Sequence, residues 1–303
     1  MDIRLSCGSE VQLGLRKMRM QSPTETIYLM TRGICQASCS FCTQARSADT
    51  GSLSRVTWNV WEFGDIVDCL QGQKRVCIQC LNYPAVFDDL MEIVRQIRAP
   101  VSVSAQPFTL EEMRSLSRHV DHISISLDCF TPSLFERYKS FYNWELHWAR
   151  MRKAVEIFGR RKVISHLIVG LGETEEEAVA TMAELVDMGV LPSLFAFTPV
   201  RGTAMAQTTP PDLGAYRRLQ IARQLLVDGT VAAGDIACRN GRIVSYGTDI
   251  LCHVGPRTFM TQGCPHCNRP YYNEIPGREL YNYPGPVTEE RVRKLIAQAG
   301  VEV

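Results

Sequence analysis

Three cysteines stand close together in one short polar segment, at Cys35, Cys39 and Cys42, with the spacing Cys-x3-Cys-x2-Cys. Three thiolates in one tight loop can bind three irons of a [4Fe–4S] cube, and no fourth cysteine is near enough in the sequence to complete the set. The fourth iron would then be open to a small molecule. A disulfide with a spare thiol, or part of a zinc site, is the alternative, but structural zinc sites pair Cys-x2-Cys or Cys/His modules.

A second cysteine pair, Cys264 and Cys267, lies near the end of the chain in a segment rich in proline and aromatic residues. A Cys-x2-Cys turn supplies half of a metal site and needs further ligands. These ligands could come from Cys77, Cys80, Cys129, Cys238, Cys252, His253 or His266. The pair predicts a second iron–sulfur cluster, and a redox-inert or disulfide-forming pair is the alternative.

Polar residues and glycines follow two of the expected strands. At the end of one strand, the Asp128 carboxylate can accept hydrogen bonds from a ribose diol, with Ser126 on the same face. The alternative is an aspartate that only caps the next helix. After another strand, Gly170, Gly172 and Glu173 form a strand-to-helix turn, where a glycine pair can simply relieve backbone strain.

The elements that must position these residues alternate between short apolar strands and helices. Strands are expected at Thr26–Arg32, Arg75–Cys80, Val101–Ala105, His122–Leu127, Val163–Val169 and Leu194–Thr198. Helices are expected over Trp58–Leu70, Phe87–Arg98, Leu110–Arg118, Pro132–Tyr138, Trp144–Phe158, the segment capped by Thr174 and Glu177, and Leu213–Val227. Short connections between them are typical of parallel βα units.

This rhythm predicts an α/β fold with a (β/α) TIM-type barrel, complete or partial. We divide the chain into an N-terminal helical extension at residues 1–25, the barrel core at 26–230, and C-terminal strands with the cysteine-containing tail at 231–303. A leading helix is expected over Val11–Met20. Because barrels keep their active sites at the carboxyl ends of the strands, the first cysteine loop is expected at that end.

The C-terminal region has a different character from the core. Ala237–Tyr246 and Asp249–His253 are expected as short strands around the hairpin signal Asn240-Gly241, either completing the barrel or forming a small cap. Thr288–Ala299 is expected as a final amphipathic helix. The aromatic and proline density between them predicts a tail that packs on the body.

Composition excludes several classes of partner. The chain has 303 residues, and its 33 Lys and Arg against 32 Asp and Glu give a net charge of +1 and no basic surface for nucleic acid. No apolar run approaches a membrane span, and the N-terminus lacks the order of a signal peptide, so we expect no membrane association and a cytoplasmic location. Twelve cysteines in so long a chain favour reduced thiols over a disulfide scaffold.

The cysteine triplet, with Phe41 just before its last member, resembles the signature of the radical S-adenosylmethionine (SAM) superfamily. The resemblance implies that the open iron binds the amino and carboxylate groups of SAM. An electron donor such as ferredoxin or flavodoxin would then drive its cleavage to a 5′-deoxyadenosyl radical. It further implies roles in holding the adenine or the ribose for Phe41, Ser126, Asp128, Gly170, Gly172 and Glu173.

Three segments are similar to the biotin synthase branch of that superfamily: Ser124–Asp128, His166–Thr174 and Phe197–Thr203. The branch also contains hydrogenase-maturation and methylornithine-forming enzymes and the two-component, archaeal-type lipoyl synthases. The resemblance covers about residues 25–205 and is specific to the branch rather than to one reaction.

Biotin synthase itself needs three further strand cysteines for a sacrificial [2Fe–2S] cluster, and this sequence departs from that pattern. Cys77 stands at one of the three positions, but the others fall at serine within Val101–Ser104 and at Ile164. The departure counts against biotin synthesis. The late pair Cys264 and Cys267 is instead similar to the late cysteine motif of the two-component lipoyl synthases, which implies an auxiliary [4Fe–4S] cluster as the sulfur source.

The resemblance therefore implies a lipoyl synthase component that inserts sulfur into an octanoyl chain on a lysine of a lipoyl-carrier protein. A second radical SAM protein would make the other insertion. One alternative is a radical mutase or C–C lyase that acts on an amino acid and needs no second cluster. Another is a non-catalytic scaffold that carries a cluster to a partner.

Overall fold

Nine strands of the described residues (1–48, 50–275 and 277–301) form one sheet in the computed structural model. Their order is β3-β4-β1-β2-β5-β6-β7-β8-β9. The six strands β2, β5, β6, β7, β8 and β9 run parallel to one another. The strands β1, β3 and β4 form antiparallel pairs at the other end of the sheet. The bounds are β1 Asp2–Ser6, β2 Ile27–Thr31, β3 Ser52–Leu53, β4 Val56–Glu62, β5 Val76–Gln79, β6 Val101–Ala105, β7 His122–Ile125, β8 Val163–Val169 and β9 Val190–Ala196.

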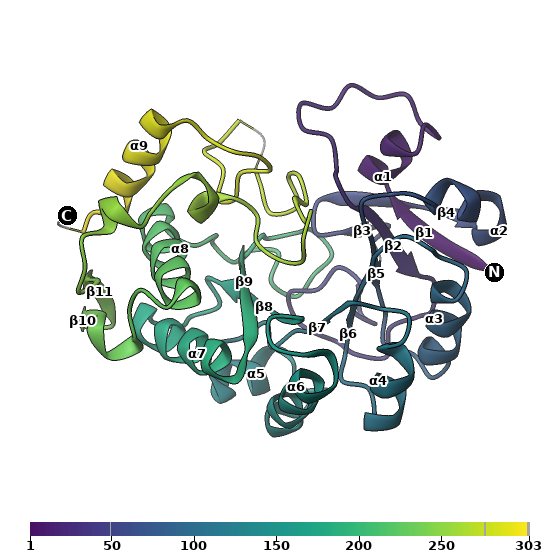
Figure 1. Ribbon diagram of the computed structural model, residues 1–303, viewed down its shortest axis with the longest axis horizontal. Helices are drawn as coiled ribbons and strands as arrows, with labels where there is room; N and C mark the ends of the chain where they lie inside the picture. The colour runs from purple at the N-terminus through teal and green to yellow at the C-terminus, as the bar shows by residue number, and fades with distance from the viewer. Residues whose placement is uncertain (49, 276, 302–303) are drawn as a thin grey trace.

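Helices between the parallel strands cover the outside of the curled sheet (Figure 1). They are α3 Val86–Val94, α4 Leu110–Leu116, α5 Pro132–Tyr138, α6 Trp144–Phe158, α7 Glu175–Met188 and α8 Leu213–Asp228. The short helices α1 Cys7–Gln12 and α2 Phe63–Ile66 flank the first strands, and α9 Glu289–Ala299 lies near the end of the chain. The predicted α/β fold with a barrel is confirmed in its partial form, because the sheet curls without closing on itself.

The capping box predicted at the start of α7 is present. Thr174 Oγ1 accepts a hydrogen bond from the Glu177 backbone N–H at 3.1 Å, and the Glu177 carboxylate accepts one from the Thr174 N–H at 2.8 Å. Two N–H groups that the helix itself leaves unpaired are thereby satisfied. The helix consequently begins at a defined residue directly after the turn that contains the predicted glycine pair.

The strand β2 separates two apolar layers. Ile27 and Leu29 pack in the large cluster between sheet and helices, whereas Tyr28 and Met30 belong to a smaller cluster on the inner side of the curl. This alternation follows from the two-residue period of a strand, and burial on both faces is typical of parallel sheets. Side chains of the second set therefore point into the barrel, together with Cys77.

The tail packs on the body, as predicted, and crosses the open side of the barrel between β9 and the strands at the other edge (Figure 1). Residues 262–273 form hydrogen bonds on both sides of this gap. Their contacts include Ser193 Oγ to the Gln262 carbonyl (2.6 Å), Asn273 Nδ2 to the Ala196 carbonyl (2.9 Å), Thr26 Oγ1 to the His266 carbonyl (2.8 Å) and Ser54 Oγ to the Tyr272 carbonyl (2.6 Å). The tail is therefore part of the barrel wall.

The helix predicted over Trp58–Leu70 is wrong for its first half. Residues Val56–Glu62 form β4, and only the short helix α2 and a 3-10 helix at Val67–Leu70 follow. The β-branched and aromatic residues of this stretch favour a strand once a partner is present. Pairing with β1 supplies that partner, and the buried Glu10 carboxylate accepts a hydrogen bond from Trp61 Nε1 at 2.8 Å.

The N-terminal helix predicted over Val11–Met20 is also wrong. The helix α1 ends at Gln12, before Gly14 adopts a φ of 74°, and residues 13–20 are not helical. The residues before α1 form β1, which lies between β2 and β4. A single strand of five residues gives little periodic signal. Its identity comes from long-range pairing with segments far along the chain.

The C-terminal hairpin is confirmed, with β10 Ala237–Arg239 and β11 Arg242–Ser245 joined at Asn240 and Gly241, both at positive φ. It forms a separate two-stranded sheet, so it does not complete the barrel. The strand predicted at Asp249–His253 is wrong, because Asp249 caps a 3-10 helix at Ile250–Cys252. The last two residues of the predicted C-terminal region, 302–303, lie outside the described residues.

Because β1 is an internal strand, truncating its core side chain should destabilise the whole domain. Leu5 is fully buried in the main core, and we expect Leu5→Ala to cost about 2–5 kcal/mol of unfolding free energy in urea titrations. Val60→Ala on the adjacent strand is the control, since Val60 is 49% exposed and its truncation should change stability by less than about 0.5 kcal/mol. Equal effects of the two variants would contradict the internal position of β1.

Candidate active site

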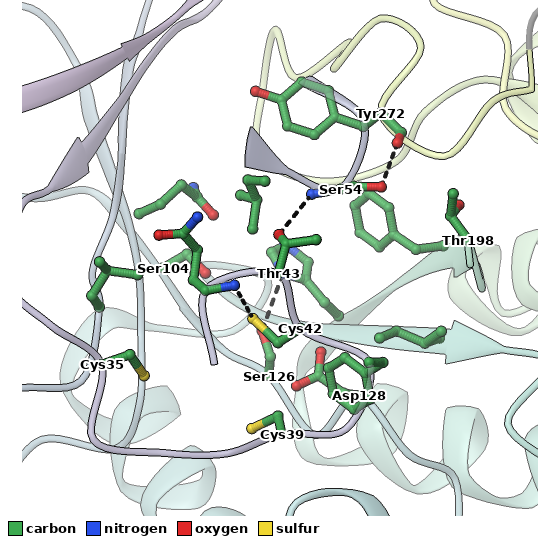
Figure 2. Close-up of a pocket in the computed structure, with 18 of the residues that line it drawn as sticks. Cys35, Cys39, Cys42, Thr43, Ser54, Ser104, Ser126, Asp128, Thr198 and Tyr272 are labelled. Carbon is green, nitrogen blue, oxygen red and sulfur yellow. Dashed lines mark hydrogen bonds between the residues drawn. The ribbon is translucent and has the colours of Figure 1, made fainter. Parts of the chain in front are cut away.

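A cavity of about 240 Å³ opens at the carboxyl ends of the parallel strands. Its wall contains the three loop cysteines, residues that end β5 to β9, and three residues of the tail, Arg269, Tyr272 and Asn273 (Figure 2). Parallel strands bring their carboxyl ends to one edge of a sheet, so residues distant in sequence meet there. The predicted position of the cysteine loop at this end of the barrel agrees with the structure.

The loop with the three cysteines follows β2 directly and is held at several backbone positions. The Gln36 N–H donates to the Asn82 carbonyl at 2.8 Å, and the Ser40 N–H donates to the Tyr138 carbonyl at 3.0 Å. A side chain at Gly33 would collide with the ring of Tyr83, which explains the glycine at the start of the loop. These contacts hold the loop across the mouth of the barrel.

Cys35, Cys39 and Cys42 are free thiols, and Figure 2 shows them facing the same space as the Asp128 carboxylate. Burial raises the pKa of Cys39 to about 12 and that of Cys42 to about 11, so a metal must displace the thiol protons on binding. The Gln44 N–H donates to Cys42 Sγ at 3.3 Å, an interaction that opposes the effect of burial and favours the thiolate.

The donor set fits an iron–sulfur cluster better than a single ion. In the described part of the chain, no three His, Cys, Asp or Glu side chains converge closely enough to hold one metal ion. A cube needs separated thiolates, because each of them binds a different iron. Three thiols around one open space meet that requirement, whereas a mononuclear zinc site would need them to converge.

Asp128 lies at the cavity with φ of 63° and forms an ion pair with Lys139, whose Nζ lies 2.9 Å from Asp128 Oδ2. Lys139 is fully buried, donates a second hydrogen bond to the Ser126 carbonyl at 2.8 Å, and lies against the rings of Phe135 and Tyr142. The other Asp128 oxygen accepts no hydrogen bond from the described residues and is available to a ligand. No sequence pattern indicated Lys139.

Ser126 and His166 are joined on the cavity wall, with Ser126 Oγ 3.1 Å from His166 Nδ1. Burial lowers the pKa of His166 well below its ordinary range, so the imidazole is neutral at physiological pH. The Ser126 hydroxyl therefore already has a partner in the protein. His166 begins one of the three segments singled out above, but no spacing indicated that it would partner Ser126, because it lies within an otherwise apolar strand.

Hydrogen bonds within the turn after β8 account for the presence of its glycines and of Glu173. Glu173 accepts hydrogen bonds from the N–H groups of Gly170 at 2.6 Å and Leu171 at 3.0 Å. Gly170 and Gly172 adopt φ of 104° and 115°, and a side chain at Gly170 would also contact Pro211. These residues are not among those that line the cavity, in contrast to Phe41, Ser126 and Asp128. Their contact with adenine stays a prediction.

The second cysteine pair lies away from this cavity. Cys264 and Cys267 form a turn, with the Cys267 N–H donating to the Cys264 carbonyl at 3.0 Å, and neither residue lines the cavity. The structure thus separates the predicted metal ligands into two groups, on the two sides of Tyr28 and Arg269. The contribution of Arg269, Tyr272 and Asn273 to the cavity wall needed the tertiary structure, although the aromatic and proline density of the tail indicated packing.

A partial (β/α) barrel with a three-cysteine loop at the carboxyl end of its first parallel strand defines a class of radical enzymes. The family model described as the Radical SAM superfamily matches residues 30–185, and the chain belongs to this superfamily. Membership implies a [4Fe–4S] cluster that binds SAM and an electron donor that reduces it. No curated protein matches the chain. The described residues include no helix of the length and apolarity that a membrane crossing requires.

Several solved structures share the fold at low sequence identity. HydG, a maturase of the [FeFe]-hydrogenase, is 15% identical with a TM-score of 0.55, and the match covers 67% of this chain and 50% of HydG. Methylornithine synthase (PylB) is 14% identical with a TM-score of 0.51, covering 64% and 59%. A radical SAM methyltransferase from Sphaerobacter thermophilus is 16% identical with a TM-score of 0.50, covering 68% and 64%. This chain thus spans between 50% and 64% of their lengths.

The Asp128–Lys139 pair permits a test that separates SAM binding from stability. Asp128→Asn leaves the Lys139 ammonium buried without its counter-charge, and we expect a loss of about 3–5 kcal/mol in urea unfolding together with weaker SAM binding. Adding Lys139→Met removes the unpaired charge and should restore much of the stability, but not the affinity for SAM measured by calorimetry on reconstituted protein. Recovery of both would mean that Asp128 has only a structural role.

Proposed function

We propose that this chain is a sulfur-inserting radical SAM enzyme, a lipoyl synthase component that acts on an octanoyl-lysine of a carrier protein. The observation that carries the proposal is the presence of two separate thiol groups in one barrel, the triplet on the cavity and the half-buried Cys264–Cys267 pair on the tail turn. A radical mutase needs one cluster, whereas an enzyme that inserts sulfur also needs a sulfur source. The second group offers a site for that source.

The wall of the cavity suits an aliphatic substrate. Besides the polar groups described above, it carries the apolar side chains Met30, Leu53, Leu81, Ile168, Phe195, Phe197 and Val200. Such a surface can bury the methylene groups of an octanoyl chain, at about 0.8 kcal/mol for each group. It also excludes water from the reacting carbon, which protects a reactive radical from side reactions.

Separate residues of the chain would bind the cluster and the ribose of SAM. Cys35, Cys39 and Cys42 hold the cluster, which supplies the electron that cleaves SAM to methionine and a 5′-deoxyadenosyl radical able to remove hydrogen from an unactivated carbon. Asp128 accepts the ribose hydroxyls, and Lys139 holds that carboxylate in place through the contact at 2.9 Å.

Three further predicted SAM contacts would complete this binding site. The Phe41 backbone approaches the adenine from the cysteine loop. The turn at Gly170 and Gly172, braced by Glu173, packs behind the adenine and keeps the start of α7 in position. Ser126 would act on the ribose through the network that it shares with His166.

Sulfur would come from an auxiliary cluster held by Cys264 and Cys267, and it would trap the substrate carbon radical to form the C–S bond. Because one insertion leaves the octanoyl chain with a single sulfur, we include a second radical SAM protein as the partner for the other insertion. Ferredoxin or flavodoxin is the proposed electron donor. The near-neutral net charge of +1 offers no surface specific for nucleic acid.

A second candidate is a radical mutase or lyase that acts on an amino acid. One observation favours it: Arg269 lies on the cavity wall, and within the described residues its guanidinium forms no ion pair with a carboxylate. The carboxylate of an amino-acid substrate could provide that partner.

Iron content separates the two functions, because sulfur insertion requires about eight irons per chain and the mutase about four.

The proposed reaction is tested by incubating the reconstituted protein with SAM, dithionite and an octanoyl-lysine peptide, and reading the peptide product by mass. We expect 5′-deoxyadenosine and a peptide heavier by one sulfur. Cys42→Ala should form neither product, because the SAM cluster loses a thiolate ligand. Cys267→Ala should still form 5′-deoxyadenosine but no thiolated peptide. A thiolated peptide formed by Cys267→Ala would contradict the role of Cys267 in supplying sulfur. Full SAM cleavage by Cys42→Ala would contradict the role of the three loop cysteines as cluster ligands.

A further inference from the structure

A row of buried side chains crosses three parallel strands on the inner side of the barrel. In the strand register, Tyr28 of β2 lies opposite Cys77 of β5, and Cys77 lies opposite Ser102 of β6. Residues opposite each other in a parallel pair share a face of the sheet, and these three are 0%, 7% and 1% exposed. They form the floor of the barrel interior against which the tail must pack.

The tail turn faces this row with both of its cysteines. Tyr28 Oη donates to Cys267 Sγ at 3.7 Å, and Cys264 lies beside Ser102 and Cys77. Cys77, between them, accepts a hydrogen bond from Gln79 Nε2 at 3.1 Å. A strand residue and two tail residues, separated by more than half the chain, therefore bring together three thiols, of which Cys77 is buried and the two tail thiols are half-buried.

Two of the three thiols, Cys77 and Cys264, have a raised pKa, and burial is the largest cause in both. Burial is the largest cause that raises the pKa of Cys264, to about 12, and the neighbouring thiols Cys77 and Cys267 raise it further. Keeping three thiolates here without metal would be costly, because isolated buried charges are unfavourable. Metal binding removes this cost by releasing the protons and coordinating the sulfurs.

Arg269 stands between this cluster and the cavity. Its guanidinium lies 5.6 Å, 5.5 Å and 5.7 Å from the ring centres of Tyr28, Phe195 and Tyr272, and its Nε is buried without a hydrogen-bond partner among the described residues. A buried cation without a carboxylate partner requires a nearby negative charge.

The other candidate ligands for the tail pair lie elsewhere. Cys80 faces the main cavity, Cys129 follows β7 beside Asp128, and Cys238 lies on the β10 hairpin. Cys252 is exposed on its 3-10 helix, and His266 pairs with Glu25 at the surface. Of the thiols considered for this role, Cys77 alone lies against the tail turn.

We infer that Cys77, Cys264 and Cys267 form a three-cysteine iron–sulfur site inside the barrel, with Arg269 as its buried counter-charge on the side of the cavity. The inference rests on the proposed function, since it identifies the site of the auxiliary cluster. The described residues contain no set of thiols that converges on one ion, which favours a cluster with several irons over zinc. An iron–sulfur core with three thiolates carries net negative charge, which Arg269 balances.

The ligand assignment is tested by anaerobic reconstitution of the wild type and of Cys77→Ala, Cys264→Ala, Cys238→Ala and Cys252→Ala. Iron and sulfide are counted, 5′-deoxyadenosine formation is measured, and EPR spectra of reduced samples are recorded with and without SAM. We expect about eight irons in the wild type and in the Cys238 and Cys252 variants, and about four in the other two, which keep the SAM-sensitive EPR signal and SAM cleavage.

The outcomes separate the inference from the proposed function. A wild type with about four irons would overturn the auxiliary cluster and the proposed function together. A wild type with about eight irons and a Cys77→Ala variant with the same content and EPR spectrum would overturn only the role of Cys77. If Cys77→Ala loses both clusters, the iron content of Cys77→Ser, which preserves the size of the side chain, is measured instead. A thermal unfolding scan of this variant shows whether it is folded. A folded serine variant that also lacks both clusters would contradict the assignment.

The role of Arg269 as counter-charge is tested by the midpoint potential of the auxiliary cluster. Arg269→Met removes the counter-charge, so we expect the auxiliary cluster to be harder to reduce and its midpoint potential to become more negative, while Arg269→Lys stays close to the wild type. The measurement is a redox titration followed by EPR. An unchanged potential in Arg269→Met, with a raised KM for an amino-acid substrate, would assign Arg269 to substrate binding and overturn its role as counter-charge.

Discussion

The hydrogen bonds by which the tail crosses the open side of the barrel are the interaction on which the rest of the structure depends. A curled sheet that does not close leaves unpaired backbone groups at both edges, and these must find other partners. Residues 262–273 lie across that gap, between Ser193 of β9 on one side and Ser54, which directly follows β3, on the other. Without them the interior cluster around Tyr28 and Cys77 would be open to water, and the cavity would lose one wall.

Part of the site followed from local sequence alone. The cysteine loop was expected at the end of the first parallel strand, and the alternation of strands and helices was sufficient to predict a TIM-type barrel. Asp128 was expected at a strand end and does line the cavity. These features depend on nearest neighbours in the chain, where periodicity and turn residues carry the information.

The features that escaped prediction depend on contacts between distant segments. β1 becomes a strand because it pairs with β2 and β4, and β4 becomes one because it pairs with β1 and β3. The spacing of Trp58–Glu62 suits a helix as well as a strand. Lys139 reaches Asp128 only because α5 packs beside the end of β7. Arg269 reaches the cavity only because the tail closes the barrel. No window of adjacent residues contains this information, since tertiary pairing overrides local preference.

Several expected site residues also acquire a local explanation once their neighbours are known. Glu173 is saturated by backbone N–H groups of its own turn, and the Ser126 hydroxyl is engaged by His166. Both residues can therefore influence SAM by positioning backbone and neighbouring side chains. The Asp128 oxygen that faces the cavity is different, because its partner Lys139 occupies only the opposite oxygen.

The same tail segment closes the open side of the barrel and completes the second thiol site. Cys264 and Cys267 reach Cys77 only when the tail lies in the gap, and the same segment contributes Arg269, Tyr272 and Asn273 to the cavity wall. Metal bound at the three thiols would tie the tail to β5 and so stabilise the wall against which substrate packs, since a ligand that binds only the folded arrangement shifts the equilibrium toward it. The sulfur source, the counter-charge and the substrate wall would then all depend on one segment of the tail, which its hydrogen bonds to β9 and Ser54 hold in the gap.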